Sequence, residues 1–169
     1  MPSCSCPPPV YPIDAPLADL RTAELLLVAT VRLFMTTQEV GVRVRDWRAG
    51  FMAGGIDQDA VPAFETLMRI MIAAIPRPLD FRCLGCAQMG VDEARLLQLI
   101  SVFQAGRYAD GGALLTIWLP PTAMRLAVLP AQELASAMAL GGFHMPLRHS
   151  EAALPHPYAF ADRGHTLVQ

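Results

Sequence analysis

The sequence predicts an all-α fold, a compact bundle of six to seven mostly short helices with an extended, proline-rich N-terminal arm. Three observations support this prediction. Apolar residues recur at i, i+3 and i+4 along most of the chain, which is the spacing of one helix face. Glycine and proline separate these stretches at short intervals, which indicates tight connections. No segment is a strong candidate for a strand.

The chain divides into three predicted parts. An arm over 1–16 holds six of the fifteen prolines, and it cannot be helical because proline fixes φ and removes an N–H donor. A helical domain follows over 17–143, with possible halves at 17–78 and 79–143. The tail over 144–169 is polar and proline-spotted, with little periodicity, so we expect it to be irregular.

The first half contains three predicted helices. The first runs from near Pro16 to about Gln38, and a short second helix is capped by Asp46. The third starts at Asp57 or Asp59, with Pro62 tolerated in its first turn. Its core-facing stripe has helical spacing and comprises Phe64, Leu67, Met68, Met71, Ile72 and Ile75.

The second half contains four predicted helices. Asp92 is a good N-cap for a helix over about 93–105, with Glu93 in its first turn. Asp110 is the predicted cap of the next helix, which ends before Pro120. Pro121 opens a short helix and Pro130 opens another, because proline is favoured in the first turn of a helix.

Composition indicates self-association. Apolar residues make up 53% of the chain and charged residues 17%, which is more apolar surface than one small core hides. The longest apolar runs, 24–35 and 67–75, are interrupted by Arg32 and Arg69 and fall short of the ~20 residues that span a bilayer. The N-terminus lacks the features of a signal peptide. We therefore expect a cytoplasmic homo-oligomer that does not bind membranes.

Charge argues against nucleic acid as a partner. The net charge is −2, and all 13 basic residues are arginine, which fits coding bias in a GC-rich genome. Arg43, Arg45 and Arg48 surround Trp47, but the helix that follows begins with acidic residues that would repel phosphates. We expect Trp47 to lie in the core and the arginines to pair with nearby acids.

The stretch "CLGC" holds the strongest candidate site. Cys83 and Cys86 are spaced as in half of a zinc site, which needs two further ligands. These are either Cys4 and Cys6 or His144 and His149. Without an export signal, we expect reduced thiols or metal ligands and not disulfides. A thioredoxin-like role is disfavoured, because such a pair stands directly at a helix start after a buried strand. The simplest alternative is two small residues in a turn.

The sequence predicts a function only in general terms. The sequence contains no nucleophile elbow, zincin pair or phosphate-binding loop. The sequence therefore predicts a non-enzymatic interaction or regulatory protein that self-associates, with no cofactor, and an unidentified protein partner is left open. One alternative is a structural or sensory zinc protein, and a second is a bundle that binds a small apolar ligand.

Overall fold

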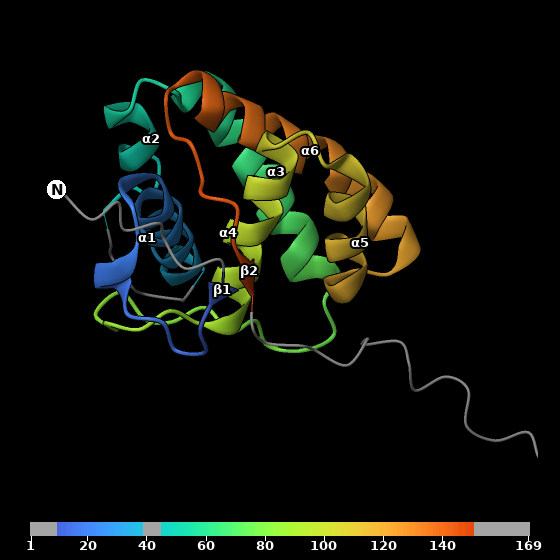
Figure 1. The fold of residues 1–169 in the computed structure, drawn as a ribbon, viewed down its shortest axis with the longest axis horizontal. Helices are drawn as coiled ribbons and strands as arrows, with labels where there is room; N and C mark the ends of the chain where they lie inside the picture. The colour runs from blue at the N-terminus through green and yellow to red at the C-terminus, as the bar shows by residue number, and fades with distance from the viewer. Residues whose placement is uncertain (1–9, 39–44, 151–169) are drawn as a thin grey trace, which may run out of the picture.

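The structure, a computed structural model, describes residues 10–38 and 45–150. Within these ranges six α-helices form a compact bundle, which confirms the predicted all-α class (Figure 1). A 3-10 turn, Leu17–Asp19, precedes them. Two short strands are β1, Val10–Tyr11, and β2, His149–Ser150. The helices are α1, Thr22–Thr37; α2, Ala49–Ala53; α3, Asp57–Ala74; α4, Val91–Gln104; α5, Tyr108–Trp118; and α6, Pro121–Leu140.

Helix α4 lies at the centre of the bundle. It contacts α1, α5, α6 and β2, and eleven of its fourteen residues are buried. An amphipathic helix buries only one face, so a helix buried on nearly all sides must be surrounded by other elements. Its charged residues are consequently also enclosed, and they need partners inside the protein.

Helices α3 and α6 pack side by side along one face of the bundle (Figure 1). The predicted apolar stripe of α3 is confirmed at Phe64, Leu67, Met68 and Met71, all with 0% exposure, but is wrong at Ile72, which is 42% exposed. The facing side of α6 is rich in alanine, whose small side chain lets two helices approach closely. Its buried members are Ala127, Pro130, Ala131, Leu134, Ala135, Ala137 and Met138.

Four aromatic rings join α1, α2 and α3. Phe34 packs edge-on against Trp47 and Phe64, with ring centroids 5.3 and 5.5 Å apart. Phe51 packs on Phe64 at 5.6 Å. Edge-to-face pairs of this kind stabilise by about 0.5–1.5 kcal/mol beyond burial. The expected core position of Trp47 is confirmed by its 4% exposure.

Two predicted helix boundaries are wrong. Helix α1 begins at Thr22 and not near Pro16, because the Glu24 carboxylate accepts the Arg21 amide and satisfies one of the free N–H groups of the first turn. Helix α6 runs unbroken through Pro130. That proline forfeits one backbone hydrogen bond, but it is buried among apolar neighbours, so packing offsets the loss.

The described segment before α1, from Val10 onward, is paired at two places. Strand β1 pairs in parallel with β2. Further on, the Leu17 amide donates to the Ala87 carbonyl and the Met89 amide donates to the Ala15 carbonyl, both at 2.8 Å. Backbone hydrogen bonds therefore fasten this segment to the loop that carries Cys83 and Cys86. The division into parts and halves stays a prediction.

No helix in the described ranges is long and apolar enough to cross a lipid bilayer. This agrees with the expectation from the interrupted apolar runs of the sequence.

Two neighbouring glycines of α5 offer a matched test of the packing. A Cβ atom on Gly111 would lie 2.5 Å from the Phe103 ring, whereas a Cβ on Gly112 would meet nothing within 4 Å. We expect Gly111→Ala to lower the free energy of unfolding by about 1–3 kcal/mol through overpacking. Gly112→Ala should raise it by up to about 1 kcal/mol, because alanine favours a helix. Urea denaturation measures both, and equal effects would contradict the packing.

Candidate functional site: the cysteine loop and its buried anchors

The loop between α3 and α4 carries Cys83 and Cys86 and lies at the bottom of the molecule in Figure 1. The two residues form a disulfide, with Cα atoms 5.4 Å apart. The pair is thus oxidised in this structure, whereas the sequence led us to expect reduced thiols or metal ligands. The physical reason is local, because the Cys86 amide donates to the Cys83 carbonyl at 3.1 Å and the resulting turn brings both side chains together.

A buried guanidinium holds this loop in place. The Arg32 side chain is only 2% exposed. Its Nη1 donates to the Cys83 and Cys86 carbonyls at 3.1 and 2.6 Å, and its Nη2 donates to the Gln88 carbonyl at 2.7 Å. Nε and Nη2 also donate to the two carboxylate oxygens of Glu93 at 2.7 and 2.9 Å. All five N–H donors of an arginine are thus satisfied.

Glu93 links this arginine to the start of α4. Its carboxylate, 1% exposed, also accepts the Gly90 amide at 2.7 Å and the Arg82 amide at 3.1 Å. Gly90 is the residue that precedes the helix, and a Cβ there would lie 2.1 Å from the Asp80 carbonyl oxygen. Only glycine fits this close approach of two backbone segments. The ion pair is acceptable inside the protein because its hydrogen bonds are complete.

Asp92 forms a second buried anchor. The prediction that it caps α4 is wrong, because the Asp80 carboxylate accepts the Val91 amide at 2.8 Å instead. The Asp92 carboxylate accepts hydrogen bonds from both terminal nitrogens of Arg77, each at 2.8 Å. It also accepts hydrogen bonds from the Asp80 amide at 2.7 Å and from the indole N–H of Trp118 at 2.8 Å. It therefore joins the loop to the end of α5.

These contacts determine the protonation of Asp92. Burial by itself raises the pKa of this carboxyl, but hydrogen bonds from Arg77, Trp118 and the Asp80 amide, with the charge of Arg77, outweigh burial and hold the pKa below its ordinary value. The hydrogen bond to Asp92, and then the charges of Asp92 and Asp80, outweigh partial burial and raise the pKa of Arg77. Asp92 therefore stays ionised and serves as a structural anion and not as a proton donor.

A third buried cluster fastens the two ends of the described chain. The Tyr11 hydroxyl donates to Glu24 at 2.5 Å, and Arg148 lies 3.6 Å from the same carboxylate. The Arg148 guanidinium also stacks over the Tyr11 ring, 5.2 Å from its centroid. Burial, and then the hydrogen bond to Glu24, raise the pKa of Tyr11 far above its ordinary value, so the phenol stays protonated.

The predicted metal ligands are not brought together in the part of the chain that the structure describes. Cys4 and Cys6 lie outside the described residues, and so does the side chain of His149. His144 is exposed, beyond the end of α6. Among the described residues no group of three or more histidine, cysteine, aspartate or glutamate side chains could hold a metal ion. The four-ligand zinc site stays a prediction, and it requires Cys83 and Cys86 in reduced form.

The disulfide contributes little as a structural staple. It joins residues only three apart, and closing so small a ring removes little entropy from the unfolded chain, roughly 2 kcal/mol against about 4.7 for a 100-residue loop. Arg32 already holds both cysteine carbonyls. The sulfur atoms are therefore better placed for chemistry than for stability.

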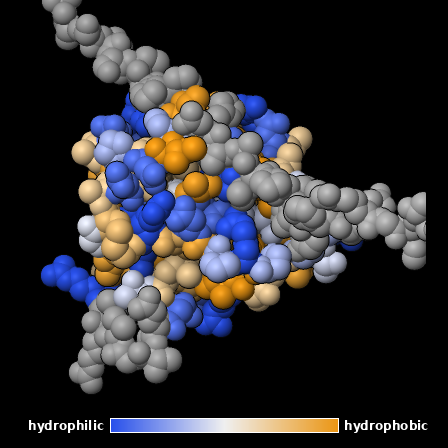
Figure 2. All heavy atoms as spheres, turned by 90° about the horizontal axis from the view of Figure 1, so that it is seen from below, coloured by the Kyte–Doolittle hydropathy of each residue, from blue (hydrophilic) through white to orange (hydrophobic). Residues whose placement is uncertain are grey.

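Access to the two cysteines is unequal. Cys83 is exposed and Cys86 is half-buried. Cys83 also borders a hollow of about 480 Å³, whose walls include Met35, Thr36, Phe81 and Leu84. The face that carries this loop shows apolar residues in small groups separated by polar ones (Figure 2). Helix α4 begins five residues after Cys86, so the helix dipole does not activate either sulfur.

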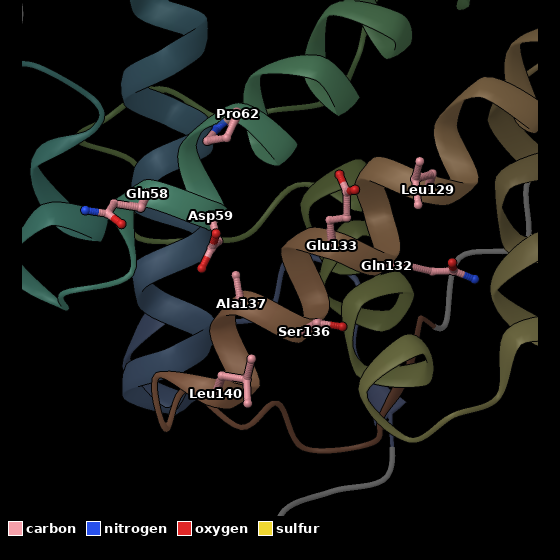
Figure 3. A pocket seen from close by; sticks show the side chains of 9 residues that line it. All are labelled: Gln58, Asp59, Pro62, Leu129, Gln132, Glu133, Ser136, Ala137 and Leu140. Carbon is pink, nitrogen blue, oxygen red and sulfur yellow. The ribbon is translucent and has the colours of Figure 1, made fainter.

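A second hollow of about 520 Å³ lies between the first turns of α3 and the later turns of α6 (Figure 3). The side chains around it come from these two helices. Asp59 and Glu133 supply carboxylates, one from each helix, and Leu129 and Leu140 supply apolar surface. The lining contains no lysine or arginine, so this groove is both acidic and partly apolar.

Comparisons with protein-family models, with curated proteins and with solved structures found no match to this chain. The geometry of the loop and of the groove must therefore carry any argument about function.

The Arg32–Glu93 pair can be tested by breaking it. Arg32→Met leaves Glu93 buried without its partner and should lower the free energy of unfolding by about 3–5 kcal/mol. The double variant Arg32→Met/Glu93→Leu should recover a substantial part of this loss, because neither charge remains. As a matched control, Arg69→Met breaks the exposed pair with Glu65, where Arg69 is 73% exposed, and should cost under about 1 kcal/mol. A double variant no more stable than Arg32→Met would contradict the pairing.

Asp92 should make the protein acid-sensitive. Because its folded pKa lies below that of the unfolded chain, its contribution is complete above about pH 4 and is lost as the pH falls through the folded pKa. Asp92→Asn should lower the free energy of unfolding by roughly 1.5–3 kcal/mol at pH 7. That difference should shrink as the pH falls below about 4. Urea titrations across this range measure it, with the exposed Asp19→Asn as control. A constant difference would count against the assignment.

Proposed function

We propose that the protein is an interaction or regulatory protein that self-associates, and that two copies join through α6. The observation that carries this proposal is a continuous exposed stripe along α6, with Arg125 beside the stripe and Glu133 on it at equal distances from Leu129. The described surface hollows are open to solvent, and the one between α3 and α6 adjoins this stripe.

The stripe follows the whole length of α6. Its members alternate in steps of four and three residues, which is the spacing of a helix–helix seam. The other side of α6 is buried against α3, α4 and α5, so this side is the one that remains available. Leu126, Leu129 and Leu140 are 63%, 60% and 88% exposed. The stripe comprises Thr122, Leu126, Leu129, Glu133, Ser136 and Leu140.

Two charges make this surface self-complementary. Arg125 and Glu133 lie four residues before and four residues after Leu129, on one ridge of the helix. Eight residues of helix separate them by about 12 Å, which is too far for them to pair with each other. Neither has a salt bridge within the described ranges.

A second copy of the chain fits this arrangement. If two α6 helices pack antiparallel about a two-fold axis at Leu129, Arg125 of each copy lies opposite Glu133 of the other. The arginine then enters the acidic groove that Glu133 shares with Asp59 (Figure 3). Leu126 and Leu129 of both copies pack between the two ion pairs. Apolar packing supplies affinity, and the charge pairs determine the orientation.

Charge reversal tests this interface. We expect Arg125→Glu and Glu133→Arg each to weaken self-association by about tenfold or more, which corresponds to ~1.4 kcal/mol, because like charges then meet across the axis. The combined variant Arg125→Glu/Glu133→Arg should restore the wild-type affinity, since the pair is only exchanged. Arg21→Glu, an exposed reversal at the start of α1, is the matched control and should change nothing.

Sedimentation equilibrium over micromolar concentrations measures the dissociation constants of these variants. A wild-type chain that stays monomeric throughout this range would overturn the proposal. A dimer insensitive to both single reversals would place the interface elsewhere.

A further inference from the structure

We propose that Cys83 and Cys86 form a thiol–disulfide exchange site whose substrate is a dithiol. This activity goes beyond self-association and does not depend on it. It rests on three observations, namely the disulfide itself, the unequal exposure of the two cysteine residues and the anchoring of the loop by Arg32.

The exposure of the two cysteines sets the order of attack. Cys83 is exposed beside the 480 Å³ hollow, whereas Cys86 is half-buried. A thiolate of the incoming dithiol therefore attacks Sγ of Cys83 in line with the S–S bond. The new bond joins the dithiol to Cys83, the Cys83–Cys86 bond breaks, and Cys86 departs as the thiolate.

The second thiol of the substrate completes the reaction. It loses its proton and attacks the sulfur that the substrate had bound to Cys83, which closes the substrate into a disulfide and releases Cys83. Two electrons pass from the dithiol to the protein. The two protons of the dithiol end on the thiols of Cys83 and Cys86, so no further reactant is needed.

Arg32 is a positioning residue for the reverse step. One nitrogen, Nη1, binds the carbonyls of both Cys83 and Cys86. That nitrogen belongs to a buried side chain whose other donors are also satisfied, so these bonds persist when the S–S bond is cut. The two thiols then stay adjacent, and re-formation of the disulfide is an intramolecular step with a high effective concentration. Reduction should consequently be reversible in the folded protein.

The attack order can be read from single-cysteine variants. A full-length Cys4→Ser/Cys6→Ser background leaves only the pair of interest. In this background, Cys86→Ser retains the thiol of Cys83 and Cys83→Ser retains that of Cys86. With oxidised glutathione as the probe, we expect Cys83 to form the mixed disulfide at least about tenfold faster than Cys86, as followed by intact mass. Equal rates, or a faster Cys86, would overturn the order.

Redox equilibrium tests the exchange itself. In mixtures of reduced and oxidised dithiothreitol, the background protein should pass reversibly between disulfide and dithiol with an unchanged circular dichroism spectrum. Arg32→Met/Glu93→Leu should shift the equilibrium constant about tenfold toward the reduced form, a change of ~30 mV, since the thiols are no longer held together. If this double variant does not fold, the glutathione rates still decide the proposal.

Three results would overturn the proposal. If dithiothreitol reduces the disulfide only when the protein unfolds, the disulfide has a structural role and not an exchange role. A reduced protein that does not reoxidise while folded would remove the reverse step. Stoichiometric zinc retained by the reduced full-length chain, at a level that blocks reoxidation, would show that the cysteines serve a metal instead.

Discussion

The pairing of Arg32 with Glu93 is the interaction on which the rest of the structure depends. It joins α1 to the first turn of α4, 61 residues further along the chain, and α4 is the helix around which the others pack. The same guanidinium holds the cysteine loop through three carbonyl oxygens. A charge so deeply buried is tolerable only when every donor has an acceptor. Loss of even one acceptor of the Arg32 guanidinium would therefore make its burial unfavourable.

A common device recurs at the starts of two helices. Glu24 and Glu93 each accept a backbone amide at the beginning of their own helix, and each also lies against a distant arginine, Arg148 or Arg32. Asp92 does similar work with Arg77. Every cation except histidine in this chain is arginine, whose planar, multi-donor group suits buried carboxylates better than a lysine ammonium. Whatever produced the bias toward arginine, the core makes use of it.

The sequence supported the fold better than the site. Periodicity alone identified the buried stripe of α3, because that signal is local. The unbroken course of α6 through Pro130 was not predictable, since it depends on what packs around the proline. Asp92 and Glu93 resemble ordinary helix-start residues, and only the fold brings Arg77 and Arg32 to them. The cysteine pair was recognised as the candidate site, but its oxidation depends on a turn geometry that the spacing does not specify.

The parallel pairing of β1 with β2 has a mechanical consequence. The chain enters this small sheet at the beginning of β1 and leaves it at the end of β2. Tension applied to the two ends of the polypeptide would slide the strands past each other and load their hydrogen bonds together, as in shear, while the helices between them carry no force. The buried cluster of Tyr11, Glu24 and Arg148 lies directly beside this junction. The β1–β2 pairing thus closes the described chain into a loop. An applied force reaches the helical bundle only after the hydrogen bonds between these two strands have broken.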